Sequence, residues 1–130
     1  MAAARAAQIV HDYFSGHVVG VFADDAAFEF IPLGQTVTGL AQIESVLATF
    51  YRDAFPGATV EDVRFVDGDD AVAVEWTFRG TNTGTLSGTP PTGRSVAVRM
   101  IGVYEVEVGK IQRARVYWDG ADFARQLGSD

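Results

Sequence analysis

The chain has 130 residues, of which 48% are hydrophobic and 21% charged, as is typical of one globular domain. Its formal net charge of −7 argues against a nucleic-acid partner, because phosphate binding requires a basic surface. The absence of cysteine excludes disulfides, thiol nucleophiles and thiolate metal sites.

The N-terminal segment is not expected to act as a targeting signal. Residues 1–10 are rich in alanine, but His11 and Asp12 interrupt the apolar run that a signal peptide requires. No stretch approaches the roughly 18 apolar residues that span a bilayer. We therefore expect a cytoplasmic protein without membrane contact.

The first half of the chain is predicted to be mainly helical. Residues 2–14 and 40–55 have apolar side chains at helical spacing, and Ser15-Gly16 and Pro56-Gly57 end these segments. Between them we expect a helical turn over residues 17–22, a strand over residues 27–31 and a turn over residues 32–35.

The second half alternates between apolar and polar residues with the period of two typical of strands. Strands are predicted over residues 59–67, 71–80, 95–106 and 110–118, with an exposed connection over 84–93 and a last helix over 122–127. Asp119 is expected to cap that helix. Helices followed by antiparallel strands describe an α+β fold with helices on one face of the sheet.

Several segments resemble motifs of known families. The run Phe-Ala-Asp-Asp-Ala-Ala-Phe-Glu-Phe at residues 22–30, followed by a helix start at Gly39, resembles the first-strand motif of ketosteroid isomerases and limonene epoxide hydrolases. Arg-Gly-Thr-Asn-Thr-Gly at residues 79–84 and Pro-Pro-Thr-Gly-Arg at residues 90–94 resemble the signature of SnoaL-like polyketide cyclases. The order and spacing of the motifs are similar to those of the nuclear-transport-factor-2-like superfamily.

This resemblance covers nearly the whole chain and implies a single SnoaL-like domain over residues 1–130. Its expected architecture is a cone-shaped, curved, mostly antiparallel sheet that encloses an apolar pocket together with N-terminal helices. It also implies a homodimer that forms through the outer face of the sheet, where mixed charges and Tyr117 are expected.

The alternation places nearly every charge of the predicted strands on one side, including Glu29, Glu75, Arg99, Glu105, Arg113 and Arg115. The other side is apolar, and the resemblance implies that it faces the pocket. We expect a hydrophobic substrate to be bound by Phe28, Phe30, Tyr51, Trp76, Phe78, Met100 and Val116. Tyr104 and Trp118 are the candidate catalytic residues, because their polar tips can orient a ligand oxygen.

The catalytic residues of the similar families are absent at the matching positions. The general base of the ketosteroid isomerases falls at Phe30, and their protonated acid falls at Gly102. The aspartate of the cyclases falls at Val116, and Asn82 stands where their signature has a histidine. Proton transfer by these arrangements is not expected, because each role requires a titratable or donating group. The aromatic residues either fill the cone or line a ligand-sized cavity, and we favour the cavity because small-molecule pockets are mostly apolar.

The first functional hypothesis is a cyclase or isomerase for a polyketide- or terpenoid-like substrate. It would shape the substrate rather than use a strong base, and a pericyclic ring closure of Diels–Alder type fits this lining. Tyr104 or Trp118 would polarise a carbonyl.

Two other hypotheses stay open. One is a non-catalytic binding module for an apolar metabolite. The other is an epoxide hydrolase or aldol-type cyclase with a relocated carboxylate, for which Asp12 and Glu44 are the candidates. We expect no metal and no cofactor, and we expect His11 and His17 to be surface residues.

Overall fold

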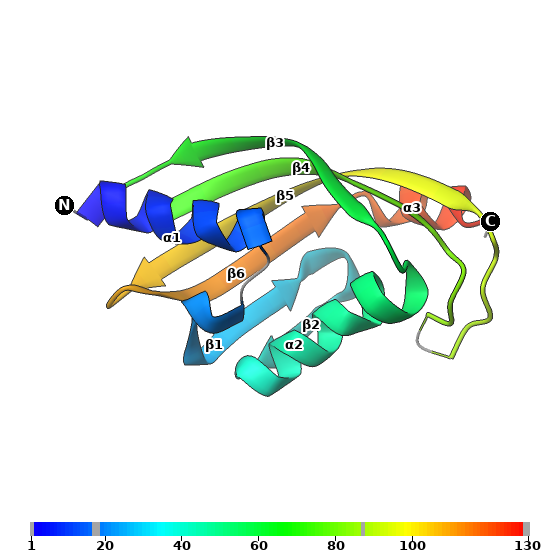
Figure 1. Cartoon of the computed structure of the whole chain (residues 1–130), viewed down its shortest axis with the longest axis horizontal. Helices are drawn as coiled ribbons and strands as arrows, with labels where there is room; N and C mark the ends of the chain where they lie inside the picture. The colour runs from blue at the N-terminus through cyan, green and yellow to red at the C-terminus, as the bar shows by residue number, and fades with distance from the viewer. Residues whose placement is uncertain (1, 17–18, 87, 129–130) are drawn as a thin grey trace.

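The protein is a curved sheet with helices on its concave face (Figure 1). The computed structural model describes residues 2–16, 19–86 and 88–128. Within these ranges three α-helices and six strands follow one another as α1 (Ala2–Gly16), β1 (Phe22–Phe30), β2 (Gln35–Thr38), α2 (Leu40–Ala48), β3 (Thr59–Asp67), β4 (Ala71–Thr81), β5 (Ser95–Glu107), β6 (Lys110–Trp118) and α3 (Gly120–Gln126).

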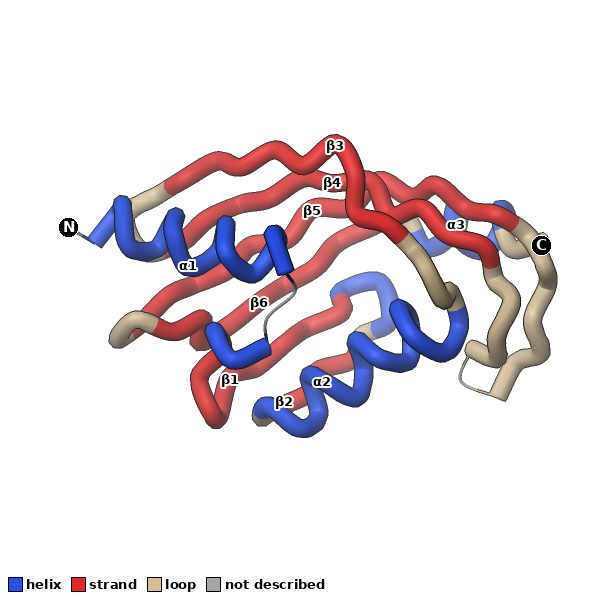
Figure 2. The backbone as a smooth tube through the Cα atoms, viewed as in Figure 1, coloured by secondary structure: helices blue, strands red, loops and turns tan. Residues whose placement is uncertain are grey.

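The strands form one sheet in the order β2-β1-β6-β5-β4-β3, and among these neighbours only β1 and β6 pair in parallel. The strands bend around α1 and α2, which lie in front of the concave face (Figure 2). The predicted α+β class with a curved, mostly antiparallel sheet is confirmed.

β1 is longer than the strand predicted over residues 27–31, and it forms a hairpin with β2 that was not predicted. β1 begins at Phe22, and its pairing with β6 shifts register between Phe22 and Ala27, where Asp24 and Asp25 are exposed. The strand was predicted to begin only at residue 27, because the irregularity at these aspartates breaks the alternation that marks a strand. β2 was missed because it is a short, polar edge strand.

The predicted helix over residues 40–55 divides into two parts. α2 ends at Ala48 and continues as the π-helical turn η3 (Thr49–Ala54), in which the Phe55 N–H donates to the Phe50 carbonyl five residues earlier (2.9 Å). A π-helical turn rotates the following side chains relative to a regular helix, and such turns are frequent at functional sites.

The two faces of the sheet separate as the alternation predicted. Val74, Trp76 and Phe78 of β4 are buried on the concave side, whereas Glu29–Arg113 and Glu105–Arg115 form ion pairs on the outer side. Thr77 is an exception, since it belongs to the outer face but is only 4% exposed. It lies opposite Glu61 and Arg99 in the ladder, so a residue with a long side chain flanks it on each neighbouring strand.

Candidate functional site

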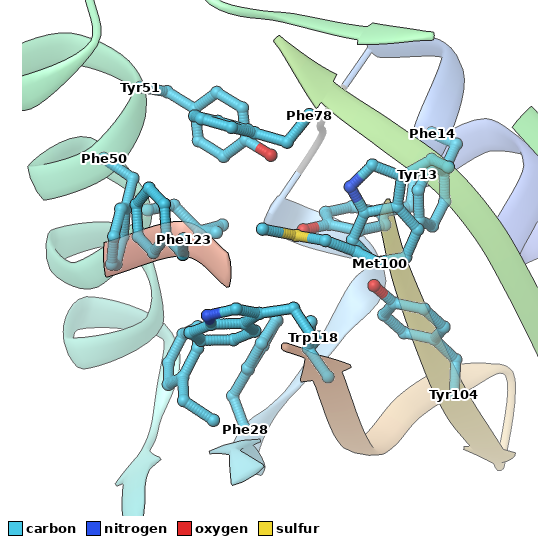
Figure 3. A pocket seen from close by; sticks show the side chains of 14 residues that line it. Tyr13, Phe14, Phe28, Phe50, Tyr51, Phe78, Met100, Tyr104, Trp118 and Phe123 are labelled. Carbon is cyan, nitrogen blue, oxygen red and sulfur yellow. The ribbon is translucent and has the colours of Figure 1, made fainter. Parts of the chain in front are cut away.

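The concave face and the helices enclose a cavity with an almost entirely apolar lining (Figure 3). All nine predicted site residues line it: Phe28 and Phe30 from β1, Tyr51 from η3, Trp76 and Phe78 from β4, Met100 and Tyr104 from β5, and Val116 and Trp118 from β6. Five other lining residues were not predicted; they come from α1, α2, η3 and α3 and are Tyr13, Phe14, Leu47, Phe50 and Phe123.

The cavity is narrow because its own side chains occupy much of the cone. Its empty volume is about 590 Å³, counting space that is open to solvent, and only about 50 Å³ can hold the centre of a water molecule. That space suffices for a few water molecules. The cone is therefore neither completely filled by side chains nor open enough for a large ligand. A ligand with fused rings can enter only if some of the lining side chains change rotamer.

The two ends of the cavity differ in exposure. At the α1 end, Tyr13, Trp76 and Tyr104 are almost fully buried, and only Phe14 is partly buried. At the α2 end, Phe50 and Phe123 are only partly buried. Figure 3 shows Phe50 and Tyr51 on one side of the cavity and Tyr13 and Phe14 on the other. Because the lining is more exposed at the α2 end, we place the mouth of the cavity there.

Flat aromatic walls line the cavity toward its mouth. Phe28 and Phe30 are stacked, with ring centroids 4.8 Å apart and planes 23° apart. Phe30 meets the edge of Trp118 at 6.3 Å, and Tyr51 meets Phe78 at 5.4 Å. Such walls favour flat, conjugated ligands, because offset-stacked and edge-on contacts between π systems are attractive.

Three tyrosine hydroxyls belong to the cavity. Burial raises the pKa of Tyr51 from 10.0 to about 12. Burial, with a smaller effect of the neighbouring tyrosines, also raises the pKa of Tyr13 and Tyr104 well above 10.0. These hydroxyls therefore stay protonated near neutral pH, where they can donate hydrogen bonds but cannot serve as bases.

Gly102 determines where the Tyr104 ring lies. A Cβ atom at Gly102 would lie 2.7 Å from Tyr104 Cε1 and 2.9 Å from the Tyr104 hydroxyl oxygen. The ring therefore covers the backbone of β5 at Gly102, which only a residue without a side chain permits. The position that matches the acid of the ketosteroid isomerases thus has no side chain of its own, and the Tyr104 hydroxyl lies beside it.

The cavity lacks acid–base groups. Among the described residues that line it, none is Asp, Glu, His, Lys or Arg. The two candidates for a relocated carboxylate do not reach it, since Asp12 is exposed and accepts a hydrogen bond from Gln8 (2.8 Å), and Glu44 is exposed on α2. The hypothesis of a relocated carboxylate therefore has no support from either residue.

His11 does not line the cavity, and the described residues form no metal site. His11 stacks on Phe65 at 3.7 Å and lies 3.1 Å from Asp67 Oδ1 at the surface, while His17 lies outside the described residues. No cluster of three or more metal-ligating side chains occurs within the described part of the chain. Asp119 caps α3 as predicted, because its side chain accepts a hydrogen bond from the Asp122 N–H (3.0 Å).

Asn82, at the position of the cyclase histidine, holds η3 in place. Its buried Nδ2 donates to the carbonyls of Ala54 (3.1 Å) and Gly84 (2.9 Å), and its Oδ1 accepts from the Thr92 N–H (2.8 Å). Asn82 thereby fastens both arms of the connection between β4 and β5 to the end of the turn that carries Tyr51. It is a positioning residue that does not line the cavity.

Replacing Asn82 with alanine is expected to lower the free energy of unfolding by about 2–4 kcal/mol, because it leaves buried backbone groups without partners. Urea denaturation measures this loss. Thr83→Ala, at the exposed neighbouring residue, is the control and should change stability by less than about 0.5 kcal/mol. Equal effects of the two substitutions would contradict the positioning role.

Comparisons with known proteins agree with this architecture. The sequence pattern of the family described as SnoaL-like polyketide cyclase matches residues 6–127. No curated protein matches the chain. No helix in the described ranges is long and apolar enough to cross a membrane.

Several solved structures share the fold at low sequence identity. A candidate polyketide cyclase from Xanthomonas campestris pv. campestris is 20% identical, with 98% of this chain and 100% of that chain covered and a TM-score of 0.87. A candidate hydroxylase from Streptomyces galilaeus is 17% identical, with 98% and 87% covered and a TM-score of 0.80. A phenazine biosynthesis-related protein from Pseudomonas aeruginosa is 16% identical, with 98% and 88% covered and a TM-score of 0.80.

Proposed function

The chain belongs to the SnoaL-like polyketide cyclase family, and on this premise we propose that it is a cyclase or isomerase acting on a hydrophobic polyketide- or terpenoid-like substrate. One observation carries the finer part of the proposal. The described lining combines flat aromatic walls with neutral hydrogen-bond donors and contains no carboxylate, imidazole or amine. Such a cavity can fold and orient an unsaturated chain, but it cannot remove a proton with a strong base.

Shaping the substrate is the proposed source of catalysis. Holding two reacting ends in contact contributes up to about 7–11 kcal/mol in favourable cases. In a Diels–Alder closure, three π bonds of a diene and an alkene become two new C–C σ bonds and one π bond, and no proton moves. The Tyr104 hydroxyl and the Trp118 N–H would polarise a carbonyl on the alkene, and the remaining seven predicted residues would hold the carbon skeleton.

A binding module without chemistry is the second candidate. The same observation supports it, because a cavity without titratable groups also fits sequestration of an apolar metabolite. The two candidates differ in whether the ligand is recovered unchanged.

Thermal unfolding with linear polyenes, steroid enones and terpene epoxides, followed by mass spectrometry of each compound, tests the proposal. A ligand at one hundred times its dissociation constant stabilises the fold by about 2.7 kcal/mol. We expect stabilisation by a polyene or an enone, accompanied by a cyclised or isomerised product. We also expect a rate that is nearly flat between about pH 6 and 9, because no described lining group titrates there.

Two variants serve as a matched pair in this assay. Phe30→Leu removes an aromatic wall and should lower turnover at least about tenfold, whereas Asp119→Asn keeps a helix-capping side chain and should stay within about twofold. The reverse order would point to Asp119 as a catalytic base. Stabilisation with unchanged compound would favour the binding module.

We also propose that the protein is cytoplasmic and forms a homodimer through the outer face of the sheet. Ile101 and Tyr117 support the dimer, since both lie on that face and are each 38% exposed. Sedimentation velocity distinguishes a dimer from a monomer.

A further inference from the structure

One polar atom in the cavity has no partner. Trp76 is 4% exposed, and no group within the described residues accepts a hydrogen bond from its indole Nε1–H. Buried donors in native proteins are nearly always satisfied, so an orphan donor calls for an explanation. Phenylalanine would fill much of the same space without burying an unsatisfied N–H.

The Trp76 N–H is near a second hydrogen-bond donor, the Tyr104 hydroxyl. Trp76 pairs with Met100 in the ladder, and Gly102, the next inward position of β5, is covered by the Tyr104 ring. The Phe14 ring contacts both residues, with centroids 5.1 Å from Trp76 and 5.5 Å from Tyr104. In Figure 3 the Tyr104 hydroxyl points toward Met100. The α1 end of the cavity therefore holds two donors on neighbouring strands.

The surroundings restrict what these donors can bind. An indole N–H only donates, so the ligand atom must be an acceptor. An anionic acceptor is excluded, because the described lining offers no cation to offset the desolvation of a charge. The acceptor is therefore neutral, and the aromatic walls next to it favour a flat, conjugated skeleton.

We infer that the Trp76 indole N–H, with the Tyr104 hydroxyl beside it, binds the carbonyl oxygen of a conjugated ketone, such as an enone, an aryl ketone or a quinone. This inference rests on the proposed function and names the functional group that the substrate presents at the α1 end of the cavity. The bound carbonyl satisfies the orphan donor and fixes which end of the substrate enters first. It also moves the main carbonyl contact from Trp118, the expected indole donor, to Trp76.

A pair of isosteric compounds tests this contact. 2-Acetylnaphthalene has a carbonyl where 2-isopropenylnaphthalene has a C=CH2 group, so the two differ mainly in one acceptor. Calorimetric titration gives the dissociation constants of both compounds for the wild type and for Trp76→Phe. We expect the ratio of the two constants to shift about tenfold toward the hydrocarbon in Trp76→Phe, which is the factor that one hydrogen bond of ordinary strength supplies.

Phe78→Leu is the matched control, since it changes the lining at the next inward residue of β4 without removing a polar group. It should alter both affinities alike and leave their ratio within about twofold of the wild type.

A measurement of ligand binding on the wild type does not depend on how Trp76→Phe folds. The sequence contains two tryptophans, so the ¹H–¹⁵N spectrum of the wild type has two indole signals, and the spectrum of Trp118→Phe is used only to assign the signal of Trp76. The ketone should move the Trp76 signal downfield, and the hydrocarbon should not. If both compounds bind but neither the ratio nor the Trp76 signal responds to the carbonyl, the inference is wrong and the proposed function stands. If the wild type binds neither compound up to its solubility limit, both this inference and the proposed function are wrong.

Discussion

Between pH 10 and pH 12 the free energy of unfolding is expected to fall by up to about 1.4 kcal/mol per pH unit for each of the three tyrosines of the cavity. The folded state holds the pKa of Tyr13, Tyr51 and Tyr104 above the ordinary 10.0. In this window the unfolded chain releases tyrosine protons that the folded protein retains, so rising pH favours unfolding. The stabilisation is complete below pH 10, and for Tyr51 it is lost as the pH passes about 12.

Urea denaturation at several pH values, with tyrosinate absorbance recorded in parallel, measures this effect. Most of the absorbance change should accompany unfolding. Tyr51→Phe should make the decline shallower by about 1.4 kcal/mol per pH unit at most, because Tyr51 is partly exposed. If all of the tyrosinate absorbance appeared in the folded protein near pH 10, the hydroxyls would be accessible to solvent and the cavity would be open.

This titration also bears on function. A tyrosine that stays neutral to high pH remains a hydrogen-bond donor under all physiological conditions. The protonation of the donors proposed for the carbonyl therefore does not change with pH in the neutral range, which agrees with a flat dependence of the rate on pH.

The strands of the site were predictable because each has one apolar face. On β4, the alternation of Val74, Trp76 and Phe78 with charged or polar neighbours fixes which side chains point inward. The lining residues of the helices were not predictable in the same way. Phe14 and Phe50 have the spacing of ordinary packing residues, and only the three-dimensional structure separates a ring that lines a cavity from one that fills a core.

Other features depend on contacts between segments that are distant in the chain. Nothing in the residues around Trp76 reveals that its N–H lacks an acceptor, because that depends on what α1 and β5 place beside it. The role of Asn82 was also hidden, since its partners Ala54 and Thr92 lie 28 and 10 residues away. The matching family signature indicated that a histidine is absent there, but not that asparagine takes up a structural role.

Replacing Gly84 with alanine is expected to lower the free energy of unfolding by at least about 3 kcal/mol, through overpacking against backbone. A Cβ atom at Gly84 would lie 1.6 Å from the carbonyl oxygen of Asp53 and 2.8 Å from its carbonyl carbon. Backbone cannot rotate aside as a side chain can, so either η3 or the connection that contains Gly84 must move. The Gly84 N–H also donates to the Ala54 carbonyl (3.2 Å), and this hydrogen bond would be lost with any such movement.

Gly120→Ala is the control for this substitution, because a Cβ atom there meets only Pro32 Cβ at the ordinary distance of 3.5 Å. It should leave stability unchanged or raise it slightly, since Gly120 begins α3 and alanine has the higher helix propensity. Urea denaturation compares the two variants with the wild type. A Gly84→Ala protein within about 1 kcal/mol of the wild type would show that the connection moves away from η3 freely.

The clash in Gly84→Ala should affect ligand binding as well as stability, because it falls on the turn η3, which also lines the cavity. Asp53 and Ala54 belong to the same π-helical turn as Phe50 and Tyr51, which form part of the lining near the mouth. Displacement of this turn should therefore weaken the binding of both naphthalene compounds. It should leave their affinity ratio near that of the wild type, because Trp76 and Tyr104 lie at the opposite, α1 end. A variant that loses affinity but keeps its preference for the ketone would separate the mouth, which admits the ligand, from the end that recognises its oxygen.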